Sequence, residues 1–84
     1  MEIDGITLIQ TSSACPEQYY AYKDGKQVGY LRLRGGFFTV QFPDSGYELI
    51  YEGEPNGDGE FDDNEREFYL TGAVRAIYNR LEGK

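Results

Sequence analysis

One dipeptide, Asp24-Gly25, constrains the fold of this chain more than any other feature of the sequence. It stands between two runs rich in tyrosine and leucine, EQYYAY at 17–22 and QVGYLRLR at 27–34. Asp-Gly between such runs is the strongest short signal for a β-hairpin, because both turn positions then tolerate a positive φ angle. The sequence therefore predicts an antiparallel pair of strands here.

Alternation in the second run predicts which of its side chains face the core. Leu31 and Leu33 alternate with Tyr30, Arg32 and Arg34. Because successive side chains of a strand point to opposite faces, the leucines are predicted to face inward and the tyrosine and arginines outward.

The remaining strand signals are short β-branched or alternating runs bounded by glycine and proline turns, and these runs lie at 6–9, 37–42 and 47–52. In the last run, Tyr47, Leu49 and Tyr51 are predicted to share one side of the strand, with Ile50 on the other. The polar, proline-interrupted segment at 11–18 is predicted to be a loop.

The C-terminal part of the chain predicts one long helix. Asp62 is a good N-cap and Glu65 follows at the third helical position, which is the pattern of a capping box. The helix is expected to run from about Asp63 to Leu81. Gly72 in its interior predicts close approach to a strand. Apolar residues at helical spacing form the face expected to cover the sheet, namely Leu70, Val74, Ile77, Tyr78 and Leu81.

These elements predict a single α+β domain over residues 1–84. It has two layers, an antiparallel β-meander of four or five strands and one C-terminal helix packed on one face. A chain of 84 residues has room for one core only. No apolar run approaches the roughly 18 residues that span a bilayer, and the start MEIDGITLIQ lacks a signal-peptide pattern. We therefore expect a cytoplasmic protein with no membrane contact.

The absence of histidine removes much catalytic chemistry. Neither the usual general base nor an imidazole metal ligand is present, and one cysteine, Cys15, does not make a zinc site. No pairing of nucleophile and base is visible, so we expect a non-enzymatic protein. The net charge of −7 disfavours direct contact with DNA or RNA, because phosphates require clustered Lys and Arg.

Negative charge is concentrated in one part of the chain. Residues 47–67 carry nine acidic residues against one basic residue, whereas residues 1–46 carry five against four. We call 54–63 the acidic loop, and its carboxylates belong to Glu54, Asp58, Glu60, Asp62 and Asp63. Such a segment speeds encounter with a basic surface. We therefore expect a protein partner with a basic surface, as for a small bacterial or phage inhibitor or accessory protein.

The segment EPNGDGEFDDNE resembles the calcium-binding loop of the EF-hand family. Gly59 falls at its glycine position, and residues with side-chain or backbone oxygens fall at its six ligand positions, namely Glu54, Asn56, Asp58, Glu60, Asp62 and Glu65. Glu54 stands where that family has Asp, and the preceding YELIY predicts a strand. The resemblance implies calcium binding with a Kd on the order of 10⁻⁴ M or weaker. The structural alternative is a turn followed by a helix cap.

The hairpin at 18–34 resembles the central hairpins of GCN5-type acetyltransferases, which would imply acetyl-CoA binding at the start of the helix. That family's loop has Gln or Arg, two residues, and then Gly-x-Gly or Gly-x-Ala. Here Gly57-Asp58-Gly59 is surrounded by carboxylates, which repel a pyrophosphate. The resemblance implies at most a degenerate acyltransferase-like fragment.

The outer sheet face is a further candidate site. Aromatic and basic residues are predicted to form an exposed patch there, namely Tyr19, Tyr30, Arg32, Arg34 and Phe37. Tyrosine and arginine are enriched in interface hot spots, and one helix covers only one face of a sheet. The alternative is an ordinary wet face with arginine stems over tyrosines. The sequence leaves open a monomer or a weak dimer through an edge strand.

Overall fold

The computed structural model describes residues 1–11 and 16–83, so Cys15 lies outside the described residues. The described part contains one six-stranded antiparallel sheet and one helix. In chain order the elements are β1 Glu2–Ile3, β2 Ile6–Gln10, β3 Glu17–Lys23, β4 Lys26–Arg34, β5 Phe37–Phe42, β6 Glu48–Gly53 and α1 Asp63–Leu81. No helix in these ranges is long and apolar enough to cross a membrane.

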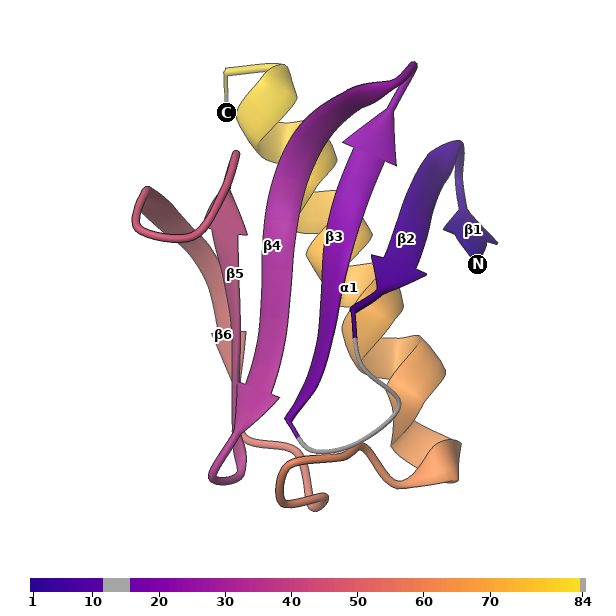
Figure 1. The fold of residues 1–84 in the computed structure, drawn as a ribbon, viewed down its shortest axis with the longest axis vertical. Helices are drawn as coiled ribbons and strands as arrows, with labels where there is room; N and C mark the ends of the chain where they lie inside the picture. Colours follow the sequence, from indigo (N-terminus) through magenta and orange to yellow (C-terminus); the bar gives the residue numbers. More distant parts are fainter. Residues whose placement is uncertain (12–15, 84) are drawn as a thin grey trace.

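The sheet is a meander, because its strand order is the order of the sequence. Figure 1 shows α1 crossing behind the sheet, so that the near face carries no helix. The predicted α+β fold, an antiparallel sheet with one C-terminal helix on one face, is confirmed. The sheet exceeds the predicted four or five strands by the two-residue strand β1, which pairs Ile3 with Ile6.

The predicted central hairpin is formed by β3 and β4. Asp24 and Gly25 have φ angles of 53° and 80°, as an Asp-Gly hairpin turn requires. The register pairs Tyr20 with Tyr30 and Ala21 with Gly29. Directly paired residues lie on the same face, so this register fixes the inward and outward sets of both strands.

The core lies between the inward face of the sheet and α1. Leu31, Leu33 and Phe38 from the sheet and Leu70 and Ile77 from the helix are fully buried. A large apolar side chain contributes about 1.5–3 kcal/mol when buried in this way. The stripe predicted on the helix is correct except at its end.

Leu81 departs from that prediction because it is 43 % exposed. Ile77 is the last buried residue of α1, and Leu81 belongs to the final turn beyond it. Ala73 is buried in the same stripe instead.

Gly72 brings α1 close to β6, as the sequence predicted. A Cβ atom at this position would lie 2.5 Å from the hydroxyl oxygen of Tyr51. Gly29 plays the same part on β4, where a Cβ would lie 2.8 Å from Cδ1 of Ile77. Because these two glycines lack a Cβ atom, Tyr51 of the sheet packs directly on the helix backbone, and Ile77 of the helix packs directly on the sheet backbone.

The predicted side-chain pattern of β6 is wrong because the strand contains a bulge. Val40 pairs with Tyr51 and Gln41 pairs with Leu49, which leaves Ile50 as the extra residue. Tyr51 therefore faces α1 with Val40, whereas Leu49 faces the opposite side with Gln41. Tyr47 precedes the strand.

Candidate functional site

The acidic loop is folded around the carboxylate of Glu65. One oxygen of this carboxylate, Oε1, accepts the N–H of Asn56 at 2.8 Å. The other, Oε2, accepts the N–H of Gly57 at 2.8 Å and that of Asp62 at 2.9 Å. The bond to Asp62 is half of the predicted capping box. Glu65 thus closes the loop and caps the helix with one group.

A second carboxylate, that of Glu17 on β3, holds the loop to the sheet. It is only 2 % exposed and accepts the N–H of Phe61 at 2.9 Å and the Nε–H of Arg66 at 2.8 Å. The hydroxyl of Tyr19 donates to the same carboxylate. The N–H of Glu17 donates to the carbonyl of Gly59 at 2.6 Å. A second nitrogen of Arg66, Nη2, also donates to the carboxylate at 3.2 Å, so this buried charge has four donors and its loss of solvent contact is compensated.

These contacts shift the pKa values of the groups involved. Burial acts to raise the pKa of Glu17, but hydrogen bonds from Arg66, Tyr19 and Phe61 outweigh it and hold this pKa below its usual value. For Glu65, hydrogen bonds from the N–H groups of Asp62, Asn56 and Gly57 likewise outweigh desolvation and lower the pKa. Burial raises the pKa of Tyr19, and its bond to Glu17 raises it further. Both carboxylates are therefore charged at neutral pH.

The calcium binding that the sequence resemblance implies stays a prediction, because the structure does not gather the acidic side chains of the loop into one cluster. Within residues 1–11 and 16–83, no group of three or more His, Cys, Asp or Glu side chains is placed to hold a metal ion. Glu65, the predicted bidentate ligand, has both oxygens bound to backbone N–H groups. Glu54, Asp58 and Asp62 are exposed. A calcium ion would have to displace the bonds that shape the loop.

The loop is also unsuited to a pyrophosphate. Its N–H groups at Asn56, Gly57 and Asp62, next to the start of α1, already donate to Glu65. The chain is folded tightly here, since a Cβ atom on Gly57 would lie 1.8 Å from the carbonyl oxygen of Glu60. A phosphate-binding loop needs free N–H groups around an open concavity. The geometry therefore does not favour an acyltransferase-like function.

The sheet face opposite α1, here called the open face, carries a row of apolar and aromatic side chains. The register pairs Ile9 with Tyr20, Tyr20 with Tyr30, Tyr30 with Gln41, and Gln41 with Leu49. The rings of Tyr20 and Tyr30 lie 5.6 Å apart. Ile9 and Leu49, at the two ends of the row, are 52 % and 49 % exposed. The row crosses five strands without a covering element.

A second row on the open face contains nitrogen donors that lack partners. Arg32 lies in it, between Gln18 on β3 and Thr39 on β5. The Nε atom of Arg32 is shielded from solvent and has no hydrogen-bond partner, and Nε2 of Gln27, also on β4, is in the same condition. In the described part of the chain these are the two buried side-chain polar atoms without a partner. An unsatisfied donor of this kind costs about 1–3 kcal/mol.

Four of the five residues of the predicted patch lie on the open face. Tyr30 and Arg32 lie at its centre, and Arg34 pairs with Phe37 at one end. Phe37 is 45 % exposed. Tyr19 was assigned wrongly, because it pairs with the inward residue Leu31 and is buried in the core.

The sequence prediction also missed Tyr20, Ile9 and Leu49 as members of the open face. For Tyr20 and Ile9, the sequence signal was the alternation of side chains along β3. Ala21 is the small residue that faces Gly29, so Tyr20 must face outward with its partner Tyr30. Pairing then places Ile9 on the same side.

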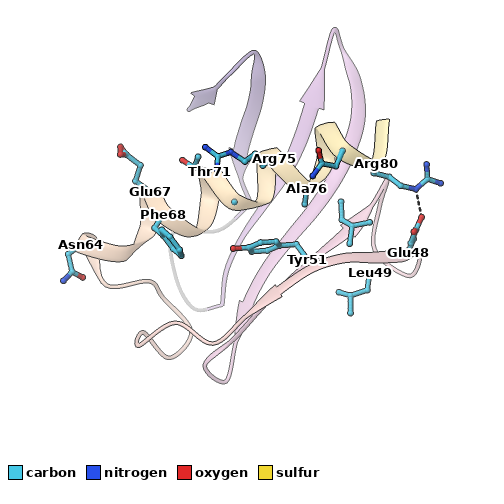
Figure 2. Close-up of a pocket in the computed structure, with 13 residues that line it drawn as sticks. Glu48, Leu49, Tyr51, Asn64, Glu67, Phe68, Thr71, Arg75, Ala76 and Arg80 are labelled. Carbon is cyan, nitrogen blue, oxygen red and sulfur yellow. Dashed lines mark hydrogen bonds and ion pairs between the residues drawn. The ribbon is translucent and has the colours of Figure 1, made fainter. Parts of the chain in front are cut away.

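On the helix side, β6 and α1 border a groove of about 1020 Å³. The lining residues on α1 recur at helical spacing and include Asn64, Phe68, Gly72, Ala76 and Arg80. Figure 2 shows Tyr51 and Phe68 pointing into the space between the two elements. At one end, Nε of Arg80 lies 2.6 Å from a carboxylate oxygen of Glu48, and this ion pair joins the walls.

Comparison with known protein families, with curated proteins and with solved structures gives no match for this chain.

Proposed function

We propose that this chain is a small non-enzymatic protein that binds another protein through its open face. The supporting observation is the Nε–H of Arg32, a shielded donor without an acceptor beside a row of aromatic and aliphatic side chains. A partner that offers an acceptor to the guanidinium would let Arg32 turn outward and satisfy this donor, which would remove its cost in the free protein. Tyrosine and arginine at the centre of such a row are the residue types that dominate interface energies.

The open face has a size and composition suited to a protein contact. From Ile9 to Leu49 the row crosses four strand intervals, or roughly 19 Å at about 4.8 Å each. Tyr20 and Tyr30 offer rigid rings at its centre, and the tyrosine hydroxyl of Tyr30 is held by Gln18 at 2.8 Å. A rigid side chain loses little conformational freedom on binding.

The side chains of the open face and of the acidic loop indicate the chemistry of the partner's surface. It presents a carboxylate or carbonyl oxygen opposite Arg32 and apolar side chains over Ile9 and Leu49. The exposed carboxylates of Glu54 and Asp58 in the acidic loop favour a basic surface beside this contact. A protein that covers a basic surface in this way would act as an inhibitor or accessory protein.

Quantitative affinity capture from an extract of the source cells tests the proposal with two matched variants. A face variant combines Tyr30→Ser with Arg32→Ser, and a loop variant combines Glu54→Gln with Asp58→Asn. Hot-spot residues contribute about 1 kcal/mol or more each, so the face variant should bind the captured partner roughly 30-fold more weakly or worse. The loop variant should keep its affinity at high salt. Equal capture by the face variant, with an unchanged circular dichroism spectrum, would exclude the open face.

Salt dependence tests the basic character of the partner separately. If the acidic loop steers association, the association rate should fall between about 50 and 500 mM salt, and the loop variant should lower it at low salt only. An association rate that does not change over this range would contradict a basic partner surface, but it would not contradict the contact with Tyr30 and Arg32.

A further inference from the structure

The groove on the helix side runs along a free strand edge. β6 is the last strand of the sheet and pairs with β5 alone, so the backbone groups on its other side have no strand partner. Its six residues extend about 20 Å at roughly 3.3 Å each. The α1 wall from Asn64 to Arg80 extends roughly 24 Å at about 1.5 Å per residue. Edge and groove therefore have the length of an extended segment of six or seven residues.

Two small residues of α1 line this groove. Gly72 and Ala76 lie on the wall that faces β6, and Tyr51 fills the space directly below Gly72. Phe68 is 69 % exposed and its ring contacts that of the neighbouring Tyr69, with centroids 5.1 Å apart, so much of its apolar surface lies open to the groove. A strand added beside β6 would turn every second side chain into this groove and would cover Phe68.

The charges beside β6 favour one kind of strand. Glu52 pairs with Thr39 and therefore lies on the open face, and Glu54 follows the strand. On the groove side, Arg80 pairs with Glu48, and Glu67 and Arg75 add one charge of each sign, so the groove has no net charge. Basic side chains would thus find acidic neighbours on the open-face side of an added strand, and apolar side chains would find Tyr51 and Phe68 on the groove side.

We propose that the free edge of β6 accepts an extended segment of a partner protein as a seventh strand, with apolar side chains in the groove and basic side chains beside Glu52. Main-chain bonds to the edge supply the pairing, and alternation of the two residue types supplies the selectivity. This surface shares Leu49 with the open-face row but includes neither Tyr30 nor Arg32, so either proposal can fail without the other.

A second copy of this chain fits the edge poorly. Each copy carries a net charge of −7, and two antiparallel β6 strands would bring Glu48, Glu52 and Glu54 of both copies to one seam. Like charges on neighbouring strands are destabilising.

The test uses an end-blocked peptide of seven residues, alternating valine and lysine, added to the full-length protein during two-dimensional amide NMR. We expect saturable shifts at β6 and at Phe68, Gly72 and Ala76, with slower amide exchange in β6. Two control peptides carry glutamate in place of lysine, or a methyl group on every backbone nitrogen. Neither should bind, because the first reverses the charge and the second blocks strand pairing.

Two variants complete the test. Glu52→Lys, at an exposed position, should weaken the lysine peptide threefold or more, and Ala76→Arg should fill the groove and abolish its binding. Equal shifts with the methylated peptide, or shifts confined to the acidic loop, would overturn the proposal by showing charge attraction alone. A dimer that protects the β6 amides without peptide would also overturn it.

Discussion

In the acidic loop and its attachment to the sheet, two carboxylates accept seven hydrogen bonds, three at Glu65 and four at Glu17. On the open face, Arg32 and Gln27 each carry a shielded nitrogen that donates to nothing. A group of the first kind has already used its bonding capacity within the fold, whereas a group of the second kind has not. Density of charge in the sequence thus does not mark the groups whose bonding capacity is left unused by the fold.

Substitution of Glu17 should give the largest effect on stability. Glu17→Gln removes the charge that pairs with Arg66 and weakens the bond to Phe61, which should lower the free energy of unfolding by about 2–4 kcal/mol. Urea unfolding measures this loss. Glu52→Gln, at an exposed acid, is the matched control and should change stability by less than about 0.5 kcal/mol. Similar values for the two variants would mean that Glu17 does not anchor the loop.

Acid should weaken the same attachment. The pKa values of Glu17 and Glu65 are lowered in the folded state, so their contribution is fully present above the unfolded value near 4.5. It is lost as the pH falls through the folded values. Stability measured by urea midpoints should therefore decline below about pH 4.5, and less steeply in Glu17→Gln. Stability that rises on acidification would contradict the assigned contacts.

Glu65→Gln should have a smaller effect, confined to one end of the molecule. The amide group retains one acceptor but places an NH₂ group toward backbone N–H donors, so the loop should loosen and the melting temperature should fall less than for Glu17→Gln. Hydrogen exchange should accelerate at Asn56, Gly57 and Asp62. Glu67→Gln, two residues further along α1, is the control and should leave these amides unchanged.

Arg32→Met should have the smallest effect on stability. It tests whether the shielded donor of the open face, unlike the carboxylates of Glu17 and Glu65, is unused within the fold. The substitution keeps an unbranched stem and removes a shielded donor that has no partner. The free energy of unfolding should therefore change by less than about 0.5 kcal/mol, or increase. Urea unfolding is again the measurement. A loss of more than about 1 kcal/mol would show that Arg32 is used within the fold.

Local signals in the sequence predicted most of the fold. Asp24-Gly25 placed the central hairpin, the Asp62 and Glu65 pair placed the start of the helix, and Gly72 marked the close approach to β6. Each of these depends on residues near one another in the chain or on one special backbone requirement.

Two features escaped prediction because they depend on distant pairing. The bulge at Ile50 is defined only by the register of β6 against β5, and it places Leu49 and Tyr51 on opposite faces. The bond from Phe61 to Glu17 joins residues 44 positions apart. The sequence does contain a signal for this bond. Side chains alternate along β3, so Glu17 lies on the same inward face as Tyr19, and a buried carboxylate requires donors.

Amide hydrogen exchange of the unmodified protein at neutral pH, with and without about 5 mM calcium, tests most directly whether the acidic loop is a structural element. The N–H groups of Phe61, Gly57 and Asp62 should be protected although they lie in a loop, and calcium should not change their rates. Rapid exchange that becomes slow only when calcium is added would contradict this account, and would make the loop a metal site.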